Sequence, residues 1–188
     1  MKLFSHRKGL KETRTEIQID DVDDVLRNRL WNLLKIYYWD TMKEDYVSRN
    51  RYLSILFTRI WHHYLKESLD EMPNYWETLY DKVRSYFFNC EWYEVYDFLE
   101  FVALNYEDDE GIKRNDRFKE TCNSVLETEM SAYRFVGSQI TAITSKDEIK
   151  EIDEALSSPF KPVNIHIENA LKLMSNRKLP DYRNSIKE

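Results

Sequence analysis

The sequence is poor in glycine, proline, cysteine and histidine, with 3 Gly, 4 Pro, 2 Cys and 4 His among its 188 residues. Three scattered glycines cannot form a phosphate-cradling loop, so nucleotide hydrolysis by a P-loop is excluded. The two cysteines, Cys90 and Cys122, form no CxxC pair. Their spacing and small number favour a reduced, cytoplasmic setting for the protein.

Patterns that would hold a metal or a nucleophile are also lacking. A metal site in a helical bundle needs an ExxH or HExxH pattern, and none of the histidines stands in one. These histidines are His6, His62, His63 and His166. No Gly-x-Ser-x-Gly elbow occurs, and neither cysteine has a histidine nearby in the sequence. We therefore expect surface or satisfied core imidazoles, no metal and no cofactor.

Long apolar runs are missing as well. The longest, such as residues 55–57, end at Arg or His within a few residues, whereas a membrane span needs roughly 20 apolar residues. Membrane insertion is therefore excluded. The net charge of −6 argues against a surface that follows a nucleic-acid backbone throughout, because phosphate binding needs clustered Lys and Arg. A basic arm at residues 1–14 is the local exception, and we interpret it as solvated or docked on the acidic surface.

Aromatic residues are abundant, at 14% of the chain, and this composition favours long helices with aromatic packing. Apolar side chains recur with helical spacing over residues 22–37, 53–64, 76–87, 92–102 and 118–130. Asn74 and Glu77 have the spacing of a capping box before the third of these segments. We predict a mainly α fold, a multi-helix bundle with Trp92 and Leu99 in its core.

One segment departs from the helical pattern. β-favouring residues flank Gly137 and Ser138, which is the composition of a two-residue hairpin turn. We predict a small β-hairpin near residues 133–143, with residues 16–19 as a candidate third strand. At the junction between helix and hairpin, Glu129 is predicted to form a structural ion pair with Arg134. Two further helices are expected over residues 145–156 and 162–174.

Two groups of side chains leave alternatives open. Glu94, Asp97 and Glu100 recur every three residues, and such a row can share protons or hold a metal. Opposite an apolar stripe it is more typical of a solvated face, and that is our interpretation. Tyr38 and Trp39 lie beyond the apolar stripe of the first helix. Aromatic packing is favoured for them, with an exposed surface for a protein partner as the alternative.

Several segments together resemble a known family. They are FSHRKG at 4–9, LRNRLWN at 26–32, EWYEVYDFLEF at 91–101, residues 118–127, SAYRFV at 131–136 and DYRNSIKE at 181–188. Across nearly the whole chain they resemble the AbiJ N-terminal domain family. The resemblance implies a bacterial abortive-infection protein in which a helical domain precedes a C-terminal HEPN domain, a dimerising helical fold that often cuts RNA. It divides the chain into a helical domain at 1–176, followed at 177–188 by a linker and the start of a truncated HEPN-like helix.

The resemblance also bears on catalysis. The HEPN ribonuclease signature is an Arg, usually followed by a polar residue, and then a His four to six residues further along. Arg183 and Asn184 match its start, but Glu188 occupies the earliest position for the His. We therefore expect no complete catalytic site in this chain, and any ribonuclease activity is expected after residue 188.

Three functional hypotheses follow. The first is a regulatory or sensor module that controls a HEPN effector in a phage-defence protein. The second is a HEPN-type ribonuclease whose site is completed in a dimer, with Arg183 and Asn184 binding phosphate. The third is a non-enzymatic helical interaction scaffold. The expected partners are a second copy of the chain or the HEPN domain, with RNA or a phage-derived molecule as the trigger.

Overall fold

The computed structural model describes residues 16–40, 51–107 and 111–142, together with the single positions 4 and 8. Its helices are α2 (Asp24–Leu34), the π-helix η1 (Lys35–Trp39), α4 (Arg51–Arg59), the π-helix η2 (Ile60–Tyr64), the 3-10 turn η3 (Leu69–Glu71), α5 (Trp76–Asn89), α6 (Trp92–Asn105) and α7 (Gly111–Thr128). An antiparallel hairpin follows, made of β1 (Tyr133–Val136) and β2 (Gln139–Ala142). The prediction of a mainly α fold with a small β-hairpin is confirmed.

Other predictions fall on parts of the chain that the structure does not describe. These are the helices at 145–156 and 162–174, the residues of the basic arm apart from 4 and 8, and the segment 177–188 with Arg183 and Asn184. The domain boundary after residue 176 therefore stays a prediction. No helix within the described ranges combines the length and the apolar character that crossing a membrane requires.

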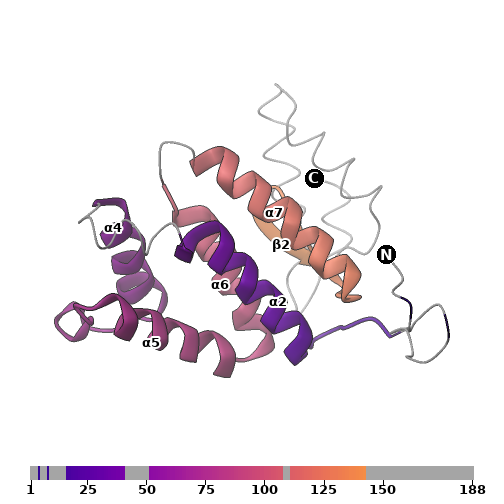
Figure 1. Ribbon diagram of the computed structural model, residues 1–188, viewed down its shortest axis with the longest axis horizontal. Coiled ribbons are helices and arrows are strands. Elements are labelled where there is room, and N and C mark those ends of the chain that lie inside the picture. The colour runs from indigo at the N-terminus through magenta and orange to yellow at the C-terminus, as the bar shows by residue number, and fades with distance from the viewer. Residues whose placement is uncertain (1–3, 5–7, 9–15, 41–50, 108–110, 143–188) are drawn as a thin grey trace, which may run out of the picture.

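Helix α6 lies at the centre of the described fold (Figure 1). It contacts α4, η2, α5, α7 and β2, while α2 lies against α7. Its buried residues are Val95, Tyr96, Phe98, Leu99, Val102 and Ala103. Leu99 is fully buried, as predicted, whereas Trp92 at the first position of the helix is only half-buried and packs on the edge of the core.

The start of α2 shows how the sequence builds a helix here. The side chain of Asp23 accepts a hydrogen bond from the backbone N–H of Leu26 at 2.8 Å, and Asp24 in the first turn favours the positive end of the helix dipole. The helix then buries Leu26, Leu30, Trp31, Leu33 and Leu34. Val25, which the apolar stripe includes, is 55% exposed because it lies about 100° from Leu26 around the axis.

Two α-helices end in π turns, in which each N–H bonds five residues back instead of four. The N–H of Asp40 bonds to the carbonyl of Lys35, and that of Leu65 to the carbonyl of Ile60. The wider turn brings Trp39 onto the buried face, five residues after Leu34. Tyr38 and Trp39 are both at most 1% exposed, so the alternative of an exposed partner surface at these residues is wrong.

Helix caps also differ from the sequence pattern. Helix α5 begins at Trp76, one residue later than a cap at Asn74 predicts, and its N-cap residue Tyr75 makes no side-chain cap. A capping box starts α6, where Glu91 and Glu94 each accept from the other's backbone N–H. Glu is not among the preferred N-cap residues, so the sequence pattern gave little indication of this box.

The hairpin has the predicted register and turn. Val136 faces Gln139, and the first residue of the two-residue turn, Gly137, has φ of +58°. A positive φ at this position alone is typical of a type II′ turn, which glycine adopts without a steric cost. The predicted third strand is reduced to one parallel bridge between Gln18 and Ser131.

Gln18 fixes the N-terminal segment although it forms no strand. Its backbone bonds to Met130 and Ala132, at 2.7 and 3.0 Å. Its side-chain amide donates to the carbonyl of Glu129 at 2.7 Å and accepts from the N–H of Asp23 at 2.9 Å. All of these bonds are made by a residue that is 3% exposed, so both polar ends of a buried amide are satisfied.

The ion pair predicted between Glu129 and Arg134 requires correction. Glu129 pairs with Arg29 of α2, and the guanidinium of Arg134 donates to the carbonyls of Ser131 and Tyr133, at 2.8 and 2.6 Å. Arg134 is 5% exposed, and this burial lowers its pKa from the ordinary value. The two residues lie close in sequence, but the contact between α2 and α7 gives Glu129 a partner from a distant part of the chain.

Candidate functional site

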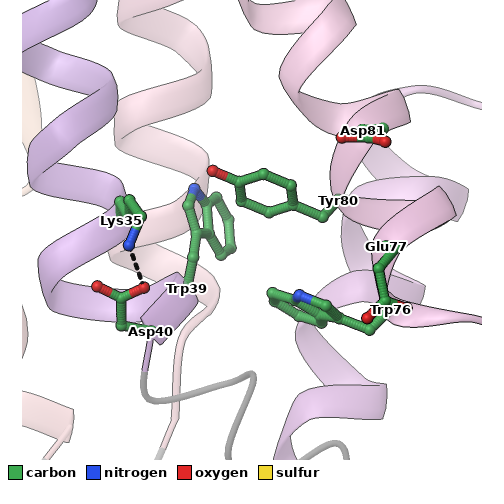
Figure 2. Close-up of a pocket in the computed structure, with 7 residues that line it drawn as sticks. All are labelled: Lys35, Trp39, Asp40, Trp76, Glu77, Tyr80 and Asp81. Atoms are coloured by element: carbon green, nitrogen blue, oxygen red, sulfur yellow. Dashed lines mark hydrogen bonds and ion pairs between the residues drawn. The ribbon is translucent and has the colours of Figure 1, made fainter.

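A pocket lies between η1 and α5 (Figure 2). Its volume is about 250 Å³. The lining residues are Lys35, Trp39, Asp40, Trp76, Glu77, Tyr80 and Asp81. Pockets for drug-sized ligands begin at about 300 Å³, so this one is slightly too small for such a ligand and suits a smaller molecule.

Local structure places these side chains on two facing elements. On α5, Trp76 and Tyr80 are four residues apart and share a face, with Glu77 and Asp81 one position further round. The rings of Trp76 and Tyr80 stack, with centroids 5.7 Å apart and planes inclined by 29°. On the other side, the π turn of η1 presents Trp39. The pocket therefore joins a wall of aromatic rings to a rim of charged groups.

The charges around the pocket are unbalanced. Lys35 is its only positive lining residue, against the carboxylates of Asp40, Glu77 and Asp81. Lys35 forms an ion pair with Asp40, and that hydrogen bond raises the pKa of the lysine. No ion pair within the described ranges reaches Glu77 or Asp81. Two negative charges in excess therefore remain on the α5 side, and they favour a ligand that donates hydrogen bonds or carries positive charge.

Trp39 contributes an unusual feature. Its side chain is 1% exposed, yet its indole Nε1–H has no hydrogen-bond partner. Stacking on Phe57, at 5.6 Å and 23°, and contact with Trp31 hold the ring in place. Figure 2 shows the ring of Tyr80 extending from α5 toward the nitrogen-bearing edge of Trp39. A buried donor without an acceptor costs about 1–3 kcal/mol, so an acceptor brought by a ligand would stabilise this site.

A second polar cluster lies between η2, α5 and α6. The hydroxyl of Tyr64 donates to the carbonyl of Glu94 at 2.9 Å, and that of Tyr86 lies 3.3 Å from both Tyr64 and the Glu94 carboxylate. Burial raises the pKa of Tyr64 above its ordinary value and that of Tyr86 to about 12. Both phenols therefore stay protonated at neutral pH and act as hydrogen-bonding groups that connect the helices.

The row of carboxylates is only partly the solvated face that we predicted. Asp97 is exposed, in agreement with the prediction. Glu94 instead closes the capping box of α6 and accepts from Tyr86, and Glu100 accepts from the backbone N–H of Ile140 in β2. The row therefore attaches α6 to α5 on one side and to the hairpin on the other.

These carboxyls predict a dependence of stability on pH. Burial raises the pKa of Asp97 and of Glu100, and the charge of Glu94 raises that of Asp97 further. At Glu100 the hydrogen bond from Ile140 partly offsets the effect of burial, and the charge of Asp97 adds a smaller increase. A raised pKa in the folded state means that their contribution is fully present below the unfolded value of about 4 and is lost as pH rises through the folded value. The double variant Asp97→Asn/Glu100→Gln should therefore gain stability relative to the parent between pH 4 and 7.

The gain should stay below about 1 kcal/mol because Asp97 is exposed and water screens its charge. Thermal unfolding followed by circular dichroism at several pH values measures it, with Asp70→Asn on the exposed η3 turn as the control. Equal pH profiles for the parent and the double variant would contradict the raised pKa values of Asp97 and Glu100.

The remaining candidates from the sequence carry no assembled site. His62 and His63 are exposed and adjacent, as the surface interpretation predicts, while His6 and His166 lie outside the described residues. Across the described ranges, no group of three or more His, Cys, Asp or Glu side chains is arranged to hold a metal ion.

Both cysteines are free, and burial raises the pKa of each thiol. Cys90 lies 3.6 Å from the guanidinium of Arg27, which partly offsets that shift, while Cys122 is fully buried. A raised pKa keeps a thiol protonated, and the thiolate is the nucleophilic form. Neither cysteine therefore has the character of an activated nucleophile.

The sequence pattern missed most of the pocket. Trp76 and Tyr80 counted only as core positions, and Lys35, Asp40 and Asp81 received no role. The one usable signal was the spacing of five residues from Leu34 to Trp39, which fits a π turn better than an α turn. The pocket is built by η1 and α5, which are separated in the sequence by α4, η2 and η3, and a local pattern does not show that they meet.

Within the described ranges, the chain forms a helical body with a short hairpin and a small pocket between η1 and α5. The family model described as AbiJ N-terminal domain 4 matches residues 2–158. The chain belongs to this family, and the resemblance found in the sequence is confirmed. It is thus a module of an abortive-infection protein, a class that acts in defence against phage. Searches of curated proteins and of solved structures found no match.

Proposed function

We propose that this chain is the regulatory module of a cytoplasmic bacterial abortive-infection protein. It senses a molecule that appears on phage infection and, until then, restrains a C-terminal HEPN effector. The observation that supports a sensing role most directly is the pocket of Trp39, because a buried indole donor without an acceptor favours binding of a partner molecule. Family membership supplies the defence context.

Hydrogen bonds from η1 to α7, and from α7 to the hairpin, support communication from the pocket to the C-terminal side. η1, which carries Trp39, is bonded to α7 through two hydroxyls. That of Tyr37 lies 2.7 Å from Thr121 Oγ1, and that of Tyr38 donates to Asn115 Oδ1 at 3.0 Å. A ligand that shifts η1 would therefore act on α7 directly.

Helix α7 is in turn fixed to the hairpin. The amide of Asn123 donates to the carbonyl of Phe135 at 2.9 Å and accepts from its N–H at 2.7 Å, and Lys119 donates to the carbonyl of Gly137 at 3.2 Å. After β2 the chain continues into residues 143–188, which precede the proposed effector. The pocket and the exit of the chain are thus attached to the same helix, as a regulatory module requires.

Removing the module should release the effector. When the native protein is produced from an inducible promoter in bacteria, we expect the C-terminal region alone to stop growth without phage. The intact protein should stop growth only after infection. Growth curves and viable counts in the presence and absence of phage measure this difference.

Two results would contradict restraint: a harmless C-terminal region, or an intact protein that is equally toxic without phage. The ribonuclease hypothesis predicts instead that the purified chain cleaves RNA and loses this activity on Arg183→Ala. No described residue favours that outcome, since Arg183 and Asn184 lie outside the described ranges. We further propose self-association and an RNA trigger, and both can be tested with the same purified protein.

A further inference from the structure

We infer that the pocket between η1 and α5 binds a free nucleobase or nucleoside that carries an exocyclic amino group, such as adenosine or cytidine. The inference rests on the proposed sensing function and names the ligand class for it. Three properties of the pocket lead to this class: an indole donor, an excess of carboxylates and a wall of aromatic rings.

The indole N–H of Trp39 has no hydrogen-bond partner and almost no exposed surface, so a ligand acceptor reaches it only when the neighbouring ring of Tyr80 shifts. Polyamines and the side chains of Lys and Arg offer only donors, so they would leave this buried N–H without a partner. A nucleobase offers ring nitrogens or a carbonyl as acceptors beside its amino group. The ligand must therefore combine an acceptor with donors on one small frame.

The carboxylates of Glu77 and Asp81 specify the donor. Carboxylates accept hydrogen bonds from exocyclic amino groups, as in the pairing of Glu or Asp with the amino group of cytosine. A base with a carbonyl in place of the amino group would place that carbonyl, an acceptor, against the carboxylates, which are also acceptors. Lys35 forms an ion pair with Asp40, which reduces the positive charge available to a phosphate. The lining therefore favours a nucleoside over a nucleotide.

The aromatic wall and the size of the pocket fit a single base. The half-buried ring of Tyr80 is of the kind on which bases stack, while the buried Trp76 supports it by stacking against it. A volume of about 250 Å³ suits one base or nucleoside and is too small for a stretch of oligonucleotide. The same base chemistry occurs at unpaired positions of RNA. The net charge of −6 and the acidic rim oppose an RNA backbone, so we assign the free molecule as ligand.

Isothermal titration calorimetry on the 188-residue chain tests the inference. Adenosine is compared with inosine and cytidine with uridine, since each second member has a carbonyl in place of the amino group. We expect at least one amino nucleoside to bind ten or more times more tightly than its counterpart, and more tightly than its 5′-monophosphate. A short oligoadenylate distinguishes an RNA source from the free nucleoside.

Substitutions at the charged rim test whether the nucleoside binds in this pocket. Asp81→Asn and Glu77→Gln should each weaken binding of the amino nucleoside about tenfold or more, because a hydrogen bond to a charged group is lost. Asp70→Asn on η3, which also removes one exposed carboxylate but does not line the pocket, should change the affinity less than twofold. Trp39→Phe removes the indole donor and should also weaken binding. Because Trp39 is a core residue, the rim variants decide the result if Trp39→Phe does not fold.

Several outcomes would overturn the inference. These are no heat of binding with either amino nucleoside at millimolar concentration, equal binding of inosine or uridine, rim variants with unchanged affinity, or binding of the oligoadenylate without binding of adenosine. The growth experiment on the effector does not depend on nucleosides. A released effector together with no nucleoside binding would retain the proposed function and reject only this ligand.

Discussion

Replacing Phe98 with alanine is expected to lower the free energy of unfolding by about 3–5 kcal/mol, the range for a large aromatic residue truncated in a core. Phe98 has no exposed surface. Its ring contacts those of Trp39, Tyr64, Tyr86 and Phe87, with centroids between 5.3 and 6.5 Å away. These rings come from η1, η2 and α5, so one truncation opens a cavity where three elements meet α6.

Urea unfolding followed by circular dichroism measures this loss. Whole domains are stable by only about 5–15 kcal/mol, so Phe98→Ala should remove a large fraction of the stability. The matched control is Leu104→Ala on the same helix, since Leu104 is 59% exposed and should cost less than about 0.5 kcal/mol. A loss below about 1 kcal/mol at Phe98, or equal losses at both positions, would show that α6 is not the central helix.

The sequence predicts well those features that depend on neighbouring residues. The helical period of α6 and the turn at Gly137 are determined locally, by the spacing of apolar residues and by a backbone conformation that glycine adopts at low cost. Leu99 and the hairpin register accordingly agree with the structure. Val25 and Trp92 do not, because a periodic stripe does not show where the neighbouring elements stop covering it.

Features that depend on tertiary contacts could not be predicted from the sequence. Arg29 pairs with Glu129 across 100 positions of sequence, and Gln18 bonds to the carbonyl of that same Glu129. From the sequence, the nearby and oppositely charged Arg134 is the expected partner of Glu129. In the structure, the guanidinium of Arg134 donates to two backbone carbonyls instead. The pocket likewise could not be predicted from the sequence, because η1 and α5 meet only when the chain has folded.

The second large effect is expected from disrupting the contact between α7 and the hairpin. Asn123→Ala should reduce protection against phage at least tenfold in the intact native protein while leaving the affinity of the pocket within about threefold of the parent. The change removes both bonds to Phe135 and leaves a backbone N–H and a carbonyl of β1 without partners. A coupling free energy between sites is typically about 1–3 kcal/mol, which corresponds to a change of about 5–150-fold.

The control must lose comparable polar contacts away from this route. Arg59→Ala serves, since Arg59 donates to the carbonyl of Asn105 at 2.8 Å and to Glu107 at 2.9 Å, between α4 and the end of α6. Plating efficiency with phage, together with melting temperatures of both purified variants, separates loss of coupling from loss of stability. If Arg59→Ala reduces protection as much as Asn123→Ala at equal stability, the hairpin has no special role in communication. If only Asn123→Ala does so, the junction of α7 and β1 is the part of the fold through which the pocket acts on the effector.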